Sequence, residues 1–456
     1  MQPDTAIRPV STRVKMPRPL ESPDCRRVSV VGAGYLGTTH AVSMAQLGHD
    51  VVAMDIEREK IAMLSECELP FFEPGLAELL RKSMEAGRLR FTTSYDDVAE
   101  ADVHFVCVGT PQLPGSFNAD LRPVETAFTE LARRVTGPTI IVGKSTVPVG
   151  TALRMADAVG RHAAGGQVEV AWNPEFLREG HAVEDALQPD RLIFGVKSPQ
   201  AEQLLRAVYR PIIEDGCPVM VTDYATAELV KVSANTFLAM KISFINAMAQ
   251  ICEATGAAVL PLAEALGYDD RIGRRFLSPG LGFGGGCLPK DVRALCACAT
   301  DLGLDDVAAF IRQVDAINLS RRDRALALGR ELLGGTYAHK RVCVLGAAFK
   351  PNTDDVRDSP ALAVAVAAHQ EGAQVIMHDP VAMNSARRIH PEIEYADTIV
   401  TAAREADLVM LLTDWTDFED MDPALLSGVV RSRNVLDGRN VLTPEHWRSA
   451  GWTYRA

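Results

Sequence analysis

The glycine pattern Gly32-x-Gly34-x-x-Gly37, placed directly after a short β-branched run, is the feature that most constrains the fold. Residues 28–31 predict a strand, and residues 35–47 predict the helix that follows it. In such a turn Gly32 permits the sharp bend, Gly34 lets the backbone approach a pyrophosphate, and Gly37 lets the helix pack closely on the strand. The pattern therefore predicts a Rossmann-like, dinucleotide-binding unit at the start of the chain.

The residue after the next predicted strand indicates the cofactor. Residues 50–54 predict that strand and complete a βαβ unit of about 30 residues. Asp55 follows it, and a carboxylate there accepts from the adenosine ribose hydroxyls and repels a 2′-phosphate. The pyrophosphate would lie on the helix N-terminus. These residues favour NAD over NADP, although Arg58 is close to Asp55 in sequence. The alternative is a degenerate loop that binds nothing.

Strand-like runs alternate with helical stretches in both halves of the chain, which predicts an α/β protein with two Rossmann-like domains and mainly parallel sheets. Further strands are predicted at 103–108, 139–142, 168–171, 192–196, 341–346, 375–380, 408–412 and 429–437. Residues 219–255 contain no Gly and no Pro. With Asp223 as a cap and Gly256 as a stop, they predict a long central helix over 224–255. At 1.5 Å per residue it would extend about 48 Å, which suits a connector or a subunit interface.

Composition excludes several classes of protein. The 456 residues include 47 Lys and Arg against 59 Asp and Glu, so the net charge is −12, which argues against nucleic-acid binding. No apolar run approaches the roughly 18 residues of a membrane span. The nine scattered cysteines and ten histidines show neither a disulfide framework nor metal-ligand spacing, and they predict a reducing cytoplasm and no metal. Residues 1–26 are rich in proline and are expected to form a flexible tail.

The stretch 271–291 is the most unusual part of the chain. Five glycines lead into Cys287: Gly280, Gly282, Gly284, Gly285 and Gly286. Because no core helix or strand tolerates that density, the backbone must pass close to something. Lys290 and Asp291 follow within one helical turn, and a nearby cation or helix N-terminus lowers the pKa of a thiol. A nucleophilic cysteine beside a hydride-accepting cofactor indicates aldehyde oxidation through a thiohemiacetal and a thioester. A buried cysteine after a flexible loop is the alternative.

Other polar candidates lie on the long helix and at predicted strand ends. Lys231 and Asn235 share a helix face and could hold an oxyanion, or that face could simply be solvated. Ser145, Thr146 and Glu175 follow strands, where ligands bind in open α/β sheets. In the second half, Lys350, Arg357 and Arg439 are candidates for anion binding, with a plain surface position as the alternative for each.

Taken together, the chain resembles the UDP-glucose/GDP-mannose 6-dehydrogenase family over about residues 28–445. The matching blocks are VVGAGYLG, VCVGTP, KSTVPVGT, NPEFLREG, AELVKVSANTFLAMKISFINA, RIGRRFL, GFGGGCLPKD, LGAAFKPNTDDVRDSP and LDGRN. The resemblance implies NAD-dependent, four-electron oxidation of a sugar C6 alcohol to a carboxylate. It also implies an NAD-binding domain over 27–216, a central helical dimerisation domain over 217–330 and a C-terminal nucleotide-sugar-binding domain over 331–456.

The resemblance also implies roles for individual residues. Cys287 would be the nucleophile, Lys231 and Asn235 would steady the C6 oxygen, and Thr146, Glu175 and Asp291 would handle water and protons. Thr110 and Arg357 would contact the cofactor together with the glycine loop and Asp55. The substrate would be bound by Phe283, Gly284, Lys350 and Arg439, and by Arg271 of the neighbouring subunit. The implied partner is a second copy bound through the central helix, with further assembly left open.

Two blocks favour UDP-glucose as the substrate. Gly286 stands where N-acetylhexosamine enzymes usually have His, and RIGRRFL matches UDP-glucose enzymes rather than GDP-mannose enzymes. Leu288 counts the other way, because leucine after the cysteine also occurs among GDP-mannose enzymes. The open alternatives are GDP-mannose and a ring-modified UDP-glucose. A one-step hydroxyacid dehydrogenase would need no Cys287 loop, and a non-catalytic dinucleotide-binding protein need not keep the whole set.

Overall fold

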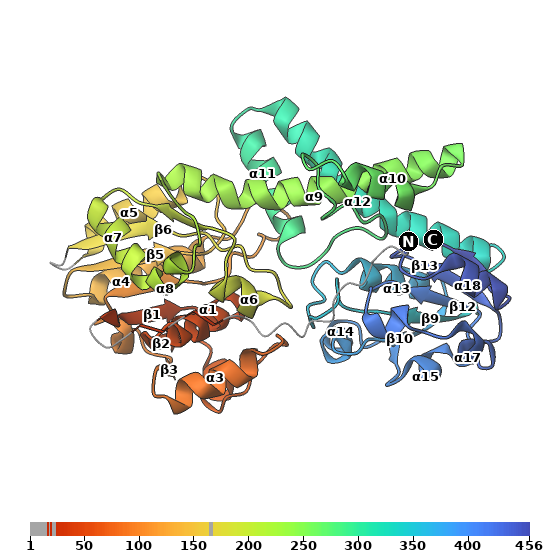
Figure 1. The fold of residues 1–456 in the computed structure, drawn as a ribbon, viewed down its shortest axis with the longest axis horizontal. Helices are drawn as coiled ribbons and strands as arrows, with labels where there is room; N and C mark the ends of the chain where they lie inside the picture. The colour runs from red at the N-terminus through yellow and green to blue at the C-terminus, as the bar shows by residue number, and fades with distance from the viewer. Residues whose placement is uncertain (1–15, 18, 21–23, 164–166) are drawn as a thin grey trace. The chain divides into compact units, whose positions relative to one another are not determined.

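The computed structural model describes residues 16–17, 19–20, 24–163 and 167–456. The chain divides into two compact units, one of Met1–Thr110 with Leu121–Leu229 and one of Pro111–Asp120 with Val230–Ala456. Figure 1 labels many of their helices and strands. The expectation of a flexible tail over 1–26 falls mostly outside the described residues. Within that stretch, the Leu20 amide donates to the Leu47 carbonyl at 2.9 Å.

The first unit is built on a sheet whose strands are almost all parallel. Its described strands are β1 (Arg27–Val31), β2 (Asp50–Met54), β3 (Leu89–Thr92), β4 (Val103–Val106), β5 (Thr139–Gly143), β6 (Val168–Trp172), β7 (Leu192–Gly195) and β8 (Val219–Thr222). Their order is β3-β2-β1-β4-β5-β6-β7-β8, and only β6 and β7 pair antiparallel. The chain order reverses at β1, between β2 and β4, which is where open α/β sheets bind ligands.

Helices of the first unit bury apolar side chains against this sheet. They are α1 (Tyr35–Gln46), α2 (Arg58–Ser65), α3 (Leu76–Glu85), α4 (Arg122–Arg134), α5 (Thr151–His162), α6 (Ala182–Leu187), α7 (Pro199–Val208) and α8 (Arg210–Glu214). Val30, Val42 and Phe105 are among the fully buried core residues. Strands buried on both faces read as continuous apolar runs, which is why β1, β2, β4 and β5 could be predicted.

The second unit holds a smaller, wholly parallel sheet. Its described strands are β9 (Arg341–Leu345), β10 (Gln374–His378), β11 (Glu394–Tyr395), β12 (Leu408–Leu411), β13 (Asn434–Asp437) and β14 (Thr453–Arg455). They lie in the order β11-β10-β9-β12-β13-β14. The order again reverses at the first strand, β9, so the predicted α/β fold with two Rossmann-like sheets is confirmed.

The second unit also contains long and short helices. The helices before its sheet are α10 (Val259–Gly267), α11 (Leu288–Asp301) and α12 (Asp305–Leu332). Those that alternate with its strands are α13 (Pro360–Gln370), α14 (Met383–Ile389), α15 (Ile399–Ala403), α16 (Thr416–Glu419), α17 (Pro423–Ser427) and α18 (Pro444–Ser449). Among the described helices, none is both long enough and apolar enough to cross a bilayer. The described side chains of His, Cys, Asp and Glu form no group of three that could hold a metal ion.

The predicted long helix is confirmed as α9 (Tyr224–Thr255), and the boundary between the two units falls within it. Asp223 caps it, because its Oδ1 accepts from the Thr226 amide at 2.8 Å. Gly256 ends it with a φ of +76°, a conformation that glycine adopts without strain.

The strand predicted over 429–437 is wrong in its first part, since only β13 (Asn434–Asp437) is extended. Val429 and Val430 instead follow α17, and both amides donate to the Leu426 carbonyl, at 3.0 and 3.2 Å. Their apolar side chains pack on the core from a turn, so a β-branched pair alone was misleading.

Candidate active site

The three glycines of the first loop have different surroundings. A Cβ on Gly32 would lie 2.8 Å from the Val108 nitrogen, and one on Gly37 would lie 1.7 Å from the Gly32 oxygen. A Cβ on Gly34 would meet nothing within 4 Å. Gly34 is also the N-cap of α1, whose end no side chain caps. The loop therefore leaves open space at an uncapped helix N-terminus, which fits the pyrophosphate of a dinucleotide.

Asp55 is held rigidly at the end of β2. Its Oδ2 accepts from the Ala33 amide at 2.8 Å and from Lys60 Nζ at 3.1 Å, and its Oδ1 accepts from the Glu57 amide at 3.0 Å. The cation beside Asp55 is thus Lys60, while Arg58 is exposed to solvent. The Ala33 contact ties the carboxylate to the glycine loop.

The different surroundings of Gly34 and Gly37 predict different effects of an alanine at each position. Gly34→Ala is expected to weaken NAD binding at least about tenfold, because a methyl group would occupy the space left for the pyrophosphate. The φ of Gly34 is −76°, so alanine fits the backbone and the melting temperature should stay unchanged. Calorimetric titration with NAD and thermal unfolding measure the two quantities. Gly37→Ala is the contrasting variant and should unfold the loop, and equal melting temperatures for both variants would contradict this assignment.

Thr110 and Thr146 meet near the carboxyl ends of β4 and β5. The Thr110 hydroxyl donates to the Thr146 carbonyl at 2.8 Å, and the Ser145 hydroxyl donates to the Val108 carbonyl at 2.6 Å. Both contacts fix the loop that follows β5. Thr146 thereby lies at the edge of the sheet where ligands bind.

Glu175 is paired with a lysine that sequence reasoning missed. Its Oε2 lies 3.1 Å from Lys144 Nζ, and its Oε1 accepts from the amides of Phe176 and Leu177. Lys144 is only 3% exposed. Burial by itself would lower the pKa of Lys144, but Glu175, Tyr209 and Cys107 together outweigh this effect, and the net pKa is raised. Lys144 is therefore charged and orients Glu175.

A sequence signal for Lys144 existed. Lys144 ends the strand run before Ser145, and Glu175 follows the next strand in the sheet. Because neighbouring parallel strands end at the same edge, a lysine and a carboxylate at those positions can meet. The Asn173 side chain completes the cluster by accepting from Lys144 Nζ at 3.0 Å.

In the second unit, Cys287 is the N-cap of α11 and its side chain is exposed. Its carbonyl accepts from the Asp291 amide at 2.9 Å, one turn later. A thiol at a helix N-terminus lies where the helix dipole favours the thiolate. This position suits an accessible nucleophile.

The carboxylate of Asp291 joins α11 to α9. Asn235 Nδ2 donates to Asp291 Oδ2 at 2.6 Å, and Lys290 Nζ lies 2.7 Å from Oδ1. Asp291 is 1% exposed, and Lys231 and Asn235 are 8% and 7% exposed. The helix face of Lys231 and Asn235 is therefore buried, and the alternative of a solvated face is wrong. Asn235, Lys290 and Asp291 form one hydrogen-bonded group within a turn of Cys287.

The glycine-rich loop presses against other segments of the same unit. A Cβ added to Gly280 would lie 2.7 Å from the Gly438 oxygen, and one added to Gly282 would lie 2.3 Å from Asn318 Oδ1. A Cβ added to Gly284 would lie 2.5 Å from the Asp358 oxygen, and one added to Gly285 would lie 2.7 Å from the Phe349 ring. The predicted close approach is confirmed, and its partner is the chain itself.

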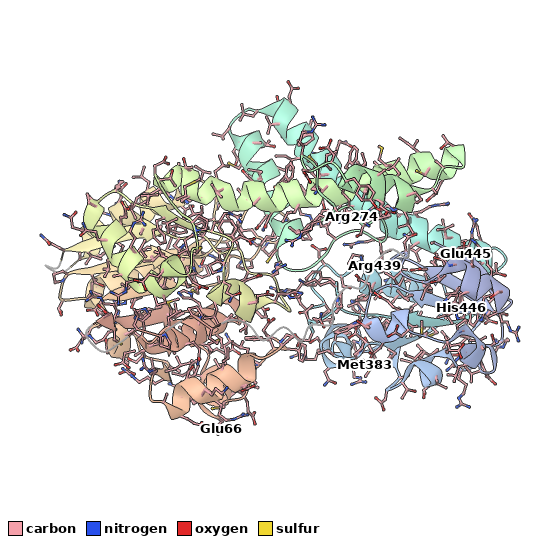
Figure 2. All side chains as sticks on the ribbon, in the orientation of Figure 1. Glu66, Arg274, Met383, Arg439, Glu445 and His446 are labelled. Carbon is pink, nitrogen blue, oxygen red and sulfur yellow. The ribbon has the colours of Figure 1, made fainter. Side chains whose placement is uncertain are left out.

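Arg439 and Phe283 serve this packing. Arg439, labelled in Figure 2, donates to the carbonyls of Leu412 at 2.7 Å and of Gly282 and Phe349 at 3.0 Å each. Burial lowers its pKa. Phe283 lies in an apolar cluster, and Asn318 binds both its amide, at 2.7 Å, and its carbonyl, at 3.0 Å. Nothing in the sequence pointed to Asn318, because its contacts are with backbone far away in the chain.

The remaining basic candidates lie nearer the surface. Arg357 pairs with Asp355 at 2.7 Å, and a Cβ on Gly286 would lie 2.3 Å from its guanidinium carbon. Lys350 Nζ lies 5.6 Å from the centre of the Phe349 ring. Arg271 is 89% exposed and pairs with Asp269 at 2.6 Å.

Comparison with known proteins places the chain in a family. Residues 26–213, 225–320 and 343–444 match the NAD binding, central and UDP binding domains of the UDP-glucose/GDP-mannose dehydrogenase family. The chain is 40% identical to a UDP-glucose 6-dehydrogenase of Rhizobium meliloti (strain 1021), over 94% of this chain and 98% of the relative. It is 38% identical to one from Bacillus subtilis (strain 168), over 94% and 96%.

A solved structure supports the same family assignment. The UDP-glucose dehydrogenase of the hyperthermophilic archaeon Pyrobaculum islandicum superposes with a TM-score of 0.87 at 38% identity, covering 94% of this chain and 98% of that one. The residue ranges matched by the family models fall in both units. The chain belongs to the UDP-glucose/GDP-mannose dehydrogenase family.

Proposed function

We propose that this protein is an NAD-dependent UDP-glucose 6-dehydrogenase, which oxidises the C6 alcohol of UDP-glucose to the carboxylate of UDP-glucuronate with two NADH formed. The observation that carries the proposal is the exposed Cys287 at the N-terminus of α11, one turn from the hydrogen-bonded group of Asn235, Lys290 and Asp291. A one-step alcohol dehydrogenase needs no such nucleophile. The relatives named above support the choice of UDP-glucose.

The cofactor would be held by residues of the first unit and by one residue of the second, Arg357. These are Gly32, Gly34, Gly37, Asp55, Thr110 and Arg357. NAD, when bound, accepts a hydride in each oxidation. Asp55, fixed by the Ala33 amide, would accept from the ribose hydroxyls. Lys60 neutralises this carboxylate in part and leaves its oxygens in place.

The chain's own groups carry the covalent part of the reaction. Lys231 and Asn235 would stabilise negative charge on the C6 oxygen. The Cys287 thiolate would add to the C6 aldehyde to give a thiohemiacetal, and oxidation of that adduct leaves a thioester. Asp291, Thr146 and Glu175 would orient water and take its proton, so that hydrolysis releases the acid and restores the thiolate.

The substrate would be bound by Lys350, Arg439, Phe283 and Gly284, and by Arg271 of the neighbouring copy. Lys350 keeps an ammonium near the surface, where it can reach a phosphate. Arg439 already donates to three carbonyls, among them that of Gly282 in the glycine-rich loop. We therefore assign it two roles, which are to hold the conformation of that loop and to contact the nucleotide sugar.

The test is the yield of NADH per nucleotide sugar, with UDP-glucose, GDP-mannose and UDP-N-acetylglucosamine measured side by side. Two NADH and one uronate from UDP-glucose are expected. One NADH with release of the aldehyde would remove the thioester mechanism. Turnover of GDP-mannose without turnover of UDP-glucose would overturn the assigned substrate, and turnover of none would leave a ring-modified hexose or a binding role in its place.

We further propose a homodimer formed through α9, with domains at 27–216, 217–330 and 331–456, acting in the cytoplasm where thiols stay reduced. Phe237, Phe244 and Ile251 follow one another at seven-residue spacing on α9 and are 58%, 47% and 54% exposed. Such a spacing places them on one face of the helix. An apolar stripe of this kind suits the same stripe of a second copy.

Phe244→Lys is the corresponding variant. It is expected to weaken dimerisation at least about 100-fold, because the contact would bury an unpaired ammonium. Sedimentation velocity over a range of concentrations measures the dissociation constant. Phe117→Lys, at a side chain that is 50% exposed in the 111–120 loop, is the control and should remain dimeric. A Phe244→Lys protein that sediments like the unmodified chain would exclude this stripe as the interface.

A further inference from the structure

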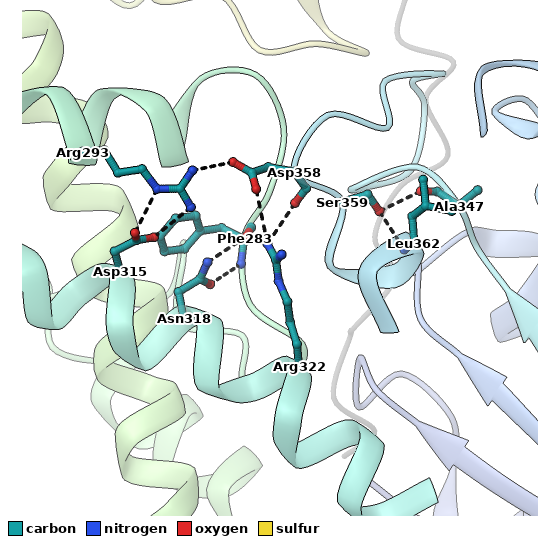
Figure 3. Close-up of polar contacts among 9 residues, drawn as sticks. All are labelled: Phe283, Arg293, Asp315, Asn318, Arg322, Ala347, Asp358, Ser359 and Leu362. Carbon is teal, nitrogen blue, oxygen red and sulfur yellow. Dashed lines mark hydrogen bonds and ion pairs between the residues drawn. The ribbon is translucent and has the colours of Figure 1, made fainter. Parts of the chain in front are cut away.

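Arg293 lies at the centre of a charged cluster that the reaction scheme above does not use (Figure 3). It is six residues after Cys287 on α11. Its Nε lies 2.9 Å from Asp315 Oδ2 on α12, and its Nη1 lies 2.8 Å from Asp358 Oδ2 in the loop before α13. The side chains of Arg293, Asp315 and Asp358 are 15%, 14% and 32% exposed. The partly buried Arg293 guanidinium thus connects α11, α12 and the loop before α13.

Asp358 occupies a conformation that needs such support. Its φ is +47°, in the left-handed region that L-residues other than glycine rarely adopt. Arg322 of α12 donates to the Asp358 carbonyl at 3.1 Å, as Figure 3 shows. The next residue, Ser359, caps α13 by accepting from the Leu362 amide at 3.2 Å. Asp358 therefore sets the path of the loop from both its side chain and its backbone.

This loop touches the peptide that carries the nucleophile. The Arg357 carbonyl accepts from the Gly285 amide at 2.9 Å. The Arg357 guanidinium fills the space beside Gly286, 2.3 Å from where a Cβ would lie. Gly286 directly precedes Cys287. The chain of contacts thus runs from Arg293 through Asp358 and Arg357 to the residue before the thiol.

We propose that Arg293 is a positioning residue that, through Asp358, holds the Arg357 guanidinium against Gly286 and so fixes the reactive geometry of Cys287. The assignment of Cys287 as nucleophile rests on the proposed function. Without Arg293, Asp315 would lose its ion pair, and Asp358 would keep only the longer pair with Arg322, at 3.7 Å. The loop of Asp358 would then lose its tie to α11, and Arg357 would move with it. A displacement of about 1 Å at a reacting group can cost about 100-fold in rate.

The first test compares steady-state kinetics of two variants. Arg293→Met is expected to lower kcat for UDP-glucuronate formation 10- to 100-fold, with KM for UDP-glucose changed less than about threefold. Arg293→Lys, which keeps one ion pair, should recover part of kcat. The matched control is Arg330→Met, which removes an ion pair of 2.6 Å between α12 and Glu371, just after α13, and should leave kcat unchanged. Equal kcat values for Arg293→Met and Arg330→Met, with melting temperatures lowered alike, would overturn the proposal.

The second test needs no sugar substrate. The rate of alkylation of Cys287 by iodoacetamide at pH 7 is followed by intact-protein mass spectrometry, with Cys287→Ser as the background. Arg293→Met is expected to slow this rate about tenfold, because the Arg357 guanidinium would leave its place beside Gly286 and a cation near a thiol favours the thiolate. An equal or faster rate would overturn the inference. If the unmodified protein fails to oxidise UDP-glucose while Arg293→Met still slows alkylation, the proposed function fails and the positioning role stands.

Discussion

Cys287→Ser is expected to bind NAD and UDP-glucose normally and to lose the formation of UDP-glucuronate by about 10³-fold or more. The loss follows because a serine hydroxyl at the N-terminus of α11 is a far weaker nucleophile at neutral pH than a thiolate. The side chain is exposed, so the substitution should leave the fold intact. Calorimetric titrations, NADH yield and chromatography of the products measure binding, oxidation and acid separately.

The control for this variant is Cys298→Ser, on the same helix and only partly buried. It should keep the full yield of two NADH per UDP-glucose. Acid formation by Cys287→Ser at the rate of the unmodified protein would remove the thioester pathway. Loss of NAD binding as well would mean that the substitution disturbs more than the nucleophile.

Those parts of the fold that depend on local pattern were predictable. The helix over 224–255 was predicted from the absence of Gly and Pro, and α9 has those bounds. Buried parallel strands such as β4 and β9 appear as apolar runs. The strands β3 and β8 were missed because they lie at sheet edges and mix polar or exposed positions with apolar ones. An edge strand packs on fewer neighbours, so its sequence carries a weaker signal.

The candidate site was predictable to the extent that its residues bear reactive groups. The reactive groups of Cys287, Asp291 and Asn235 mark them in the sequence, and the structure brings them together on α9 and α11. Residues that act by holding backbone were not predictable. Asn318 holds backbone 35 positions away, and Arg293 binds carboxylates 22 and 65 positions away, which no local spacing reveals.

Asp291→Asn is expected to slow steady-state turnover about 10²- to 10³-fold while leaving the two oxidations of the first turnover intact. Asp291 would take a proton from the water that attacks the thioester, and an amide cannot do so. Asp291 itself is 1% exposed, and Asn235 and Lys290 each bind one of its carboxylate oxygens, which fixes the position of this base. The enzyme should therefore release a burst of two NADH per subunit and then stall as a Cys287 thioester.

Rapid-mixing kinetics measures this burst, and intact-protein mass spectrometry detects the trapped adduct on Cys287. The matched control is Asp301→Asn at the exposed C-terminal end of α11, which should turn over normally. A burst of one NADH would move the role of Asp291 to the first oxidation. Normal turnover would show that the proton goes elsewhere, and Glu175, 3.1 Å from Lys144 Nζ, would then be the base to test. The geometry favours Asp291, because it is the carboxylate that the α11 helix places one turn from the thiol.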